Sequence, residues 1–287
     1  FQRVGDLIWQ AADARTRGFL LGATAGRTTL MGEGLQHQDG HSLLLASTVP
    51  FCQAYDPAFA YEVAAIVKNG LNRMYGDAPE DIFYYITLYN ENIPMPAQPS
   101  HVSTQDVING LYQWAPSTSG TAQASILFSG SAFAAATEAA EILRTKYSID
   151  VDLWSATSYK SLRDDAMEVE HWNRLHPTEK KRRSHVEAML GATTAPVIAV
   201  TDFLRIVSEQ VATFVPSRRF LSLGTDGMGR SDTREALREY FETNAPHIVI
   251  AVLFSLIGSH GVTKEVVAQA IIDLNINPDA VHSLTRD

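Results

Sequence analysis

The densest group of reactive side chains in this sequence lies in residues 32–42, which run Gly-Glu-Gly-Leu-Gln-His-Gln-Asp-Gly-His-Ser. We call this segment the histidine turn, because its three glycines and mixed polar side chains are typical of turns and poor material for a hydrophobic core. His37 and His41 could each carry a proton near neutral pH, and a neighbouring carboxylate such as Asp39 would tune either imidazole. The segment therefore predicts general acid–base chemistry in a cleft.

Two alternatives compete with acid–base chemistry in the histidine turn. His37 and His41 have the spacing of two zinc ligands on a metalloprotease helix, but that motif requires Glu where this sequence has Gln38. Gly40 also disfavours a regular helix, so we predict no metal site here. The other alternative is structural and stays open: the polar side chains would satisfy backbone amides in a turn on the protein surface.

Two further polar segments each follow a predicted strand. Residues 224–232, the glycine loop, precede a predicted helix, and their glycines with Arg230 could close on an anion. An ordinary connection between strand and helix accounts for the same residues, and we favour it. Asn90 and Glu91 follow a strand in the first part of the chain, and open parallel sheets bind ligands at the carboxyl ends of their strands. Both are candidate active-site residues, with turn formation as the alternative.

The elements that must hold these segments alternate between strand and helix. In the first part of the chain we predict a helix at 4–12, strands at 19–22, 51–55 and 82–89, and a long helix that ends at Gly76. Asp56 and Pro57 are typical of the start of that helix, because Asp caps free amides and Pro suits the first turn. The strand at 82–89 is continuously apolar and aromatic, which indicates a buried parallel strand.

Prolines at positions 94, 96 and 99 mark a domain boundary, and the alternation resumes beyond it. There we predict strands at 124–128, 151–154, 196–200 and 220–223, helices at 104–114, 204–214, 233–241 and 264–274, and an alanine-rich helix that ends near Tyr147. Such alternation predicts an α/β fold with mostly parallel sheets. We divide the chain into residues 1–100, a linker with a helix at 101–117, and a second α/β domain at 118–287.

Composition and charge exclude several classes of protein. The 287 residues are 45% hydrophobic and 19% charged, as in globular domains, and the net charge of −9 argues against a nucleic-acid-binding surface. The basic run at 180–183 is best explained as a solvated segment. Cys52 is the single cysteine, and its apolar neighbours indicate a packed thiol rather than a reactive one.

The longest apolar run, at 248–257, is far shorter than the roughly 20 residues that cross a bilayer. With no recognisable secretion signal, we expect a soluble, cytoplasmic protein that binds neither membrane nor nucleic acid. The chain opens at Phe1 within a helical apolar pattern and without an initiator methionine, so we expect it to be a piece of a longer polypeptide.

Several of these segments together resemble one enzyme family. The matching segments are residues 24–29, 32–42, 55–57, 61–63, 88–92, 172–173, 175–177, 224–227 and 229–232. From end to end the chain is similar to the C-terminal third of the homodimeric bacterial pyruvate dehydrogenase first component, a thiamine-diphosphate-dependent enzyme of the transketolase superfamily. The resemblance implies the later part of a pyrimidine-binding α/β domain up to about residue 100, followed by a transketolase-type C-terminal α/β domain.

The resemblance also implies a reaction and a site. Such enzymes decarboxylate pyruvate on thiamine diphosphate and reductively acetylate the lipoyl group of the dihydrolipoyl acetyltransferase component. The family's proton-transfer histidine matches His37, so His37 becomes the catalytic candidate. His41 is expected behind the site or along the substrate channel. Other candidate neighbours are Gln36, Asp39, Asn90 and Glu91.

The family's glutamate that activates the cofactor, and its Gly-Asp-Gly segment that holds Mg²⁺ and the diphosphate, lie upstream of this chain. We therefore expect no cofactor-binding or metal-binding residue here, and little activity from the fragment alone. The expected partners are the N-terminal remainder of the enzyme, a second copy in a homodimer, and the lipoyl-bearing acetyltransferase. The alternatives are a non-catalytic dimerisation or regulatory module of the same complex, and a related transketolase-type enzyme.

Overall fold

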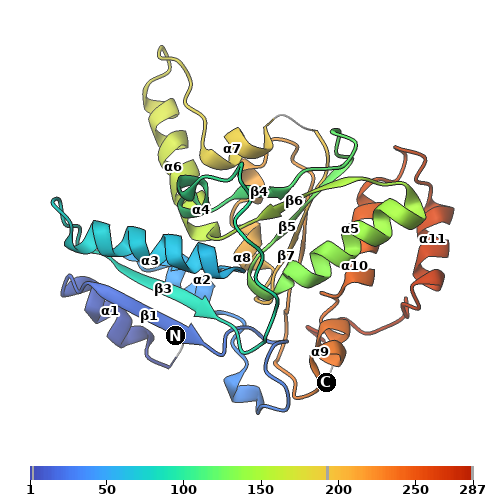
Figure 1. Cartoon of the computed structure of the whole chain (residues 1–287), viewed down its shortest axis with the longest axis horizontal. Helices are drawn as coiled ribbons and strands as arrows, with labels where there is room; N and C mark the ends of the chain where they lie inside the picture. Colours follow the sequence, from blue (N-terminus) through green and yellow to red (C-terminus); the bar gives the residue numbers. More distant parts are fainter. Residues whose placement is uncertain (2, 192–193, 286–287) are drawn as a thin grey trace.

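The computed structural model describes residues 1, 3–191 and 194–285, and its first sheet has three parallel strands. These strands are β1 (Gly18–Ala23), β2 (Cys52–Tyr55) and β3 (Phe83–Leu88), in the order β1-β3-β2. The flanking helices are α1 (Gly5–Asp13), α2 (Ser42–Ser47) and α3 (Ala60–Tyr75) (Figure 1). The predicted strand at 82–89 is the buried central strand of this sheet, which confirms the prediction.

The second sheet has five strands in the order β4-β6-β5-β7-β8. They are β4 (Tyr112–Ala115), β5 (Ala124–Phe128), β6 (Val151–Ser155), β7 (Val197–Val200) and β8 (Phe220–Leu223). Only the β4–β6 pair is antiparallel among these strands. The predicted α/β fold with mostly parallel sheets is therefore confirmed.

Helices cover both faces of the second sheet. Because successive strand residues point to opposite sides, one strand contributes side chains to the cores on both faces. Leu127 packs in one core with residues of α6 and α7, whereas Ile126 and Phe128 pack in another with residues of α5, α10 and α11. The helices concerned are α5 (Phe133–Tyr147), α6 (Tyr159–Leu175), α7 (His185–Leu190), α10 (Ala245–Ser255) and α11 (Lys264–Asp273). The remaining elements are α4 (Thr104–Asn109), α8 (Ile206–Glu209), α9 (Arg234–Tyr240) and the 3-10 turns η1 (Leu35–His37), η2 (Gly130–Ala132) and η3 (Ala212–Phe214).

One hydrophobic core runs through both sheets. Phe83 and Tyr85 of β3 belong to the same buried cluster as Leu127 of β5 and Phe203, which follows β7. Cys52 lies in this cluster with none of its surface exposed, and burial raises the pKa of its thiol to about 12. The interpretation of Cys52 as a packed, inert thiol is confirmed, and the two sheets form a continuous structure.

Two predicted helices differ from the structure. The helix predicted at 104–114 ends at Asn109, because Gly110 takes a left-handed conformation with φ of 105° and turns the chain into β4. A strand from the predicted linker is thus an edge of the second sheet. The helix predicted at 204–214 is only the single turn α8 followed by η3.

The predicted capping role of Asp56 is wrong. Helix α3 begins at Ala60, and the carboxylate of Glu62 accepts the backbone N–H groups of Ala58 and Phe59 at 2.6 and 3.0 Å. Asp56 instead turns inward, where its carboxylate accepts three hydroxyl groups from side chains in β3 and just beyond β3 and β5. The donors are Thr87 at 2.6 Å, Ser129 at 2.6 Å and Tyr89. These hydrogen bonds join the two halves of the chain, and burial raises the pKa of the Asp56 carboxyl.

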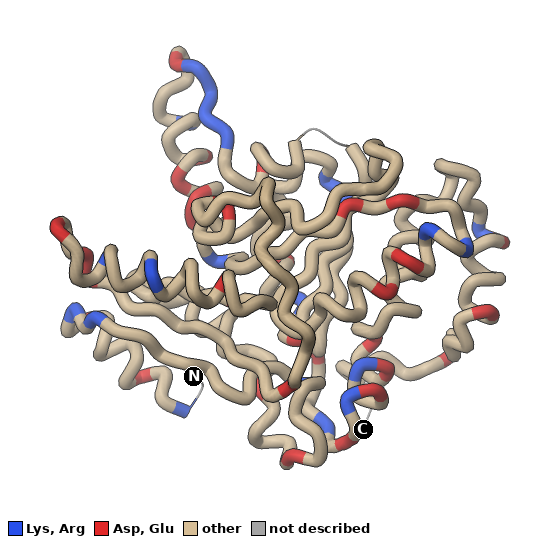
Figure 2. Tube along the Cα trace, viewed as in Figure 1, with Lys and Arg blue, Asp and Glu red and all other residues tan. Residues whose placement is uncertain are grey.

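The basic run at 180–183 lies along the segment that returns from the tip of the arm formed by α6 (Figure 2). All four side chains are exposed, as a solvated segment requires, and Arg182 stacks on Trp172 at 3.8 Å. Among the residues that the structure describes, no helix is long and apolar enough to cross a bilayer.

Candidate active site

The histidine turn follows the carboxyl end of β1 and leads into α2, the edge at which parallel sheets bind ligands. Thr24 leaves the strand with a positive φ of 65°, and η1 then places His37 at its last position. Backbone hydrogen bonds join His37 to Gly34 at 2.9 Å and Gln38 to Leu35 at 3.3 Å. The turn is therefore an ordered but irregular segment at the functional edge of the sheet.

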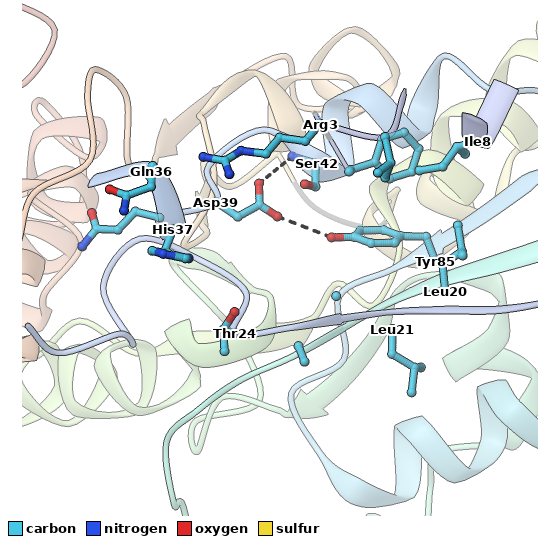
Figure 3. Close-up of a pocket in the computed structure, with 15 residues that line it drawn as sticks. Arg3, Ile8, Leu20, Leu21, Thr24, Gln36, His37, Asp39, Ser42 and Tyr85 are labelled. Atoms are coloured by element: carbon cyan, nitrogen blue, oxygen red, sulfur yellow. Dashed lines mark hydrogen bonds between the residues drawn. The ribbon is translucent and has the colours of Figure 1, made fainter. Parts of the chain in front are cut away.

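His37 lies in a pocket of about 460 Å³ (Figure 3). The turn contributes Gln36, His37, Gln38 and Asp39, whereas the sheet contributes Leu20, Leu21 and Tyr85 and the N-terminal segment contributes Phe1, Arg3 and Ile8. His37 is exposed, so its imidazole is accessible to a ligand. The pocket combines an apolar wall with a few polar groups, which is the usual character of a small-molecule site.

Asp39 serves the turn and the pocket together. Its Oδ1 accepts the backbone N–H groups of His41 and Ser42 at 3.1 and 2.9 Å, and so satisfies free amides at the start of α2. Its Oδ2 accepts the hydroxyl of Tyr85 at 3.4 Å. Burial, with the charge of Asp39, raises the pKa of Tyr85, so this phenol stays protonated. Asp39 thus satisfies turn amides, as the structural alternative expected, while it lines the pocket of His37.

His41 is not among the residues that line the pocket, although it lies between Asp39 and Ser42, which do, at the position before α2. Burial lowers its pKa, and the charge of Asp39 offsets part of that effect. A lowered pKa favours the neutral ring at neutral pH. Within the described residues, no three side chains of the His, Cys, Asp and Glu types gather as metal ligands.

Asn90 and Glu91 lie at a different place from His37. The carbonyl of Asn90 accepts Arg234 Nη2 at 2.9 Å, and the carboxylate of Glu91 pairs with Arg238, both arginines belonging to α9. Glu91 lines a second, mostly apolar pocket of about 310 Å³ beside Phe59. The structure therefore brings Gln36, His37 and Asp39 together and places Asn90 and Glu91 at the contact between the two halves of the chain.

The glycine loop receives side chains from the histidine turn and its approach. Arg27 Nη1 donates to the carbonyls of Thr225 and Gly227, each at 2.5 Å. Gln38 pairs with the backbone of Arg230 through both ends of its carboxamide. Through these contacts the loop packs against the histidine turn and the segment before it. This agrees with the structural interpretation of the loop as a connection between strand and helix.

Sequence reasoning gave no role to Arg27, Gln38 or Asp202. Asp202 follows β7, and its carboxylate accepts the backbone N–H of Thr28 at 3.0 Å. Burial raises the pKa of Asp202 to about 7. Two signals could have found these residues: Arg27 is the one cation among the small neutral residues of 24–29, and Asp202 comes just beyond the carboxyl end of a predicted strand.

Known proteins are similar to this chain in sequence and in fold. Residues 1–96 match the family model of the pyruvate dehydrogenase E1 component middle domain, and residues 110–244 match the transketolase-like TK C-terminal domain. The Pyruvate dehydrogenase E1 component of Escherichia coli (strain K12) is 46% identical over 282 residues, which is 98% of this chain. The chain belongs to the pyruvate dehydrogenase E1 family.

A second relative in this family, the Pyruvate dehydrogenase E1 component of Mycolicibacterium smegmatis (strain ATCC 700084 / mc(2)155), is 48% identical over 271 residues, or 94% of this chain. The chain spans 32% of the Escherichia coli relative and 29% of this one. It therefore represents the middle and C-terminal domains of a pyruvate dehydrogenase E1 component, and the resemblance inferred from its motifs is confirmed.

Solved structures show the same architecture at low sequence identity. The transketolase from Leishmania mexicana superposes with a TM-score of 0.62 at 16% identity, covering 91% of this chain and 34% of that one. A split gene transketolase, described as an inactive beta4 tetramer, gives a TM-score of 0.56 at 18% identity and covers 88% of this chain and 81% of that one. These likenesses show that the pyruvate dehydrogenase E1 portion has the transketolase fold.

Proposed function

We propose that this chain supplies part of the active site of a pyruvate dehydrogenase of the acetyl-transferring type. The complete enzyme would decarboxylate pyruvate with thiamine diphosphate and reductively acetylate the lipoyl group of its acetyltransferase component. The observation that carries the proposal is the exposed imidazole of His37 in a pocket at the carboxyl end of β1, in a chain of the pyruvate dehydrogenase E1 family. His37 is the residue to which we assign proton transfer.

The proposal gives the pocket a part in holding the cofactor, which goes beyond the expectation from the sequence that this chain holds none of it. Leu20 lies beside the ring of Tyr85 and gives the pocket an apolar wall that suits an aromatic heterocycle, and Gln36 with His37 adds hydrogen-bonding groups. The proposal assigns the diphosphate and its Mg²⁺ to the N-terminal remainder of the enzyme. This division makes the chain one half of a site that is completed by other residues.

The bound cofactor supplies the electron sink for decarboxylation, and the protein moves protons and orients groups. An imidazole suits proton transfer because it can donate or accept near neutral pH. Reductive acetylation breaks the lipoyl S–S bond, places the acetyl group on one sulfur and leaves the other sulfur in need of a proton. His37 would deliver that proton, while Asp39 and Tyr85 hold the turn behind it.

His37→Ala in the full-length enzyme tests this assignment. We expect a loss of about 10²–10⁴-fold in pyruvate-dependent acetylation of the lipoyl group, the usual range for a general acid or base. The dimer should persist in size-exclusion chromatography, because His37 is exposed rather than part of the core. His41→Ala is the matched control, with a smaller expected loss. Full acetylation by His37→Ala would instead favour a non-catalytic dimerisation or regulatory role for this chain.

The assembly and location follow from the same proposal. The chain would act with its N-terminal remainder as a homodimer in the cytoplasm, and the lipoyl-bearing acetyltransferase would reach the pocket from solvent. Mixing the fragment with a separately produced N-terminal portion tests the shared site. Pyruvate-dependent activity should return only when both pieces are present, and activity in the N-terminal portion alone would contradict a shared site.

A further inference from the structure

We propose that the glycine loop of the C-terminal domain positions His37, with Gln38 as the residue that transmits the position. This inference rests on the proposed catalytic role of His37. It assigns to the C-terminal domain a task in proton transfer, although none of the residues described in that domain lines the pocket of His37. Gln38 is a positioning residue in this scheme.

Gln38 holds the turn by a two-point contact. Its side chain is only 3% exposed, although the residues before it in the turn are exposed. Its Oε1 accepts the backbone N–H of Arg230 at 2.6 Å, and its Nε2 donates to the carbonyl of the same residue. Because both ends of the carboxamide are engaged, the side chain of Gln38 has a fixed orientation. The peptide that joins it to His37 is therefore fixed as well.

The loop is shaped to accept this side chain. A Cβ atom added at Gly229 would lie 2.7 Å from Oε1 of Gln38 and 2.9 Å from Cβ of Gln38. Both distances are shorter than a Cβ atom keeps from other heavy atoms in proteins. Glycine at this position therefore permits the contact between Gln38 and the loop. The approach is specific to Gln38, since those two atoms are the nearest neighbours of the missing Cβ.

Arg27, which precedes the histidine turn, makes a second contact with the glycine loop. It is 5% exposed and donates from Nη1 to the carbonyls of Thr225 and Gly227. A Cβ at Gly40 of the histidine turn would lie 2.2 Å from its Nε, so the guanidinium is enclosed between turn and loop. Burial lowers the pKa of Arg27, and the carboxylates of Asp39, Asp226 and Asp202 offset part of that effect. The contacts of Gln38 and Arg27 with the glycine loop together restrain the turn more than either contact alone.

Orientation of this kind has a large effect on rate. A misplacement of about 1 Å in a catalytic group can lower turnover about 10²-fold, because the reacting atoms must meet in a narrow range of geometry. Within the turn, η1 is a single 3-10 turn and His37 is exposed. The contacts of Gln38 therefore decide where the imidazole points.

The decisive experiment is a double-mutant cycle in the full-length enzyme, with His37→Ala, Gln38→Ala and the double variant. We expect Gln38→Ala to lower lipoyl acetylation about 10–100-fold with little change in KM for pyruvate. In the His37→Ala background it should lower turnover no further, because a positioning residue has nothing left to position. Gln105→Ala, the same substitution at an exposed site on α4, is the matched control and should leave activity unchanged.

Two further variants keep the test informative if Gln38→Ala folds poorly. Gly229→Ala acts from the loop side and leaves Gln38 intact, and it should give the same coupled loss. Gln38→Glu keeps the acceptor for the Arg230 N–H but loses the donor to the Arg230 carbonyl, so it should retain more activity than Gln38→Ala and less than the parent. Losses that multiply in the double variants would overturn the positioning role while the assignment of His37 stands. If His37→Ala alone has no effect, the proposed function and this inference both fall.

Discussion

The histidine turn and the centre of the second sheet acquire their order in opposite ways. In the sheet, β5 is bonded to a parallel strand on each side, and its side chains are buried on both faces. In the histidine turn, residues 32–37 are exposed, and the next residue, Gln38, is held by contacts with the glycine loop. The difference teaches that a polar, glycine-rich segment can hold reactive groups in place through contacts with a distant part of the chain.

The largest effect is expected from a substitution in the second sheet. Phe128→Ala removes a fully buried ring that contacts Phe133 at 5.3 Å between centroids and Phe59 at 6.0 Å. We expect a loss of about 3–5 kcal/mol in the free energy of unfolding, because a cavity opens in a packed core. Urea denaturation measures it, with the exposed Phe51→Ala as the control. A loss confined to one segment, without a change in global unfolding, would contradict the sheet's role as the rigid part.

Asp202 links the two regions and should make stability depend on pH. Its pKa is raised from an ordinary value of about 3.9 to about 7 by burial, so the folded state binds its proton more tightly than the unfolded state does. This contribution to stability is present below about pH 4 and is lost as the pH rises toward about 7. At about 1.4 kcal/mol per pH unit, it is at most about 4 kcal/mol.

Asp202→Asn removes this titration and should flatten the fall in melting temperature between pH 4 and pH 7. The measurement is thermal unfolding across that range for the variant, the parent and Asp77→Asn, whose side chain is exposed. Identical pH profiles for the parent and Asp202→Asn would show that the carboxyl group is not a tight proton site in the folded chain.

A smaller and more local effect is expected at Arg27. Arg27→Met keeps the apolar stem but leaves the carbonyls of Thr225 and Gly227 without their donor, at about 1–3 kcal/mol. Backbone amide exchange should accelerate in the histidine turn and the glycine loop and stay slow in β5 and β7. Arg144→Met is the control, since Arg144 is exposed and pairs with Glu141. Uniform acceleration across the chain would mean that the turn is not separately ordered.

The smallest effect is expected at Thr263. Its hydroxyl accepts the backbone N–H of Val266 at 3.3 Å and caps α11. Thr263→Ala should destabilise the chain by about 1 kcal/mol, the typical value of an N-cap. Chemical denaturation measures this loss. An effect on amide exchange in the histidine turn would show that the two regions are coupled more closely than their contacts imply.

The sequence predicted the regular elements better than their ends. The strands at 82–89 and 124–128 were visible because their apolar runs do not depend on distant contacts. Asp56 has the residue type of a cap, but hydroxyl groups from Thr87 and Ser129 bind its carboxylate in the fold. Competition between a local and a distant partner cannot be resolved from local sequence.

The candidate site divides in the same way. His37, Gln36 and Asp39 could be predicted from residue type and from their place after a strand. The partners of Gln38 and Arg27 could not, because Arg230 and Thr225 lie about two hundred positions further along the chain. The family resemblance indicates which imidazole to examine. The residues proposed to orient that imidazole are identified only from tertiary contacts.

The enclosure of Cys52 has a practical consequence for testing these ideas. A thiol that is fully enclosed and protonated far above neutral pH does not react with maleimides or iodoacetamides in the folded chain. A single cysteine introduced at exposed Leu35 would therefore accept a fluorophore or spin label without background from this chain. Spectroscopy of that label would follow the movement of the turn directly during turnover.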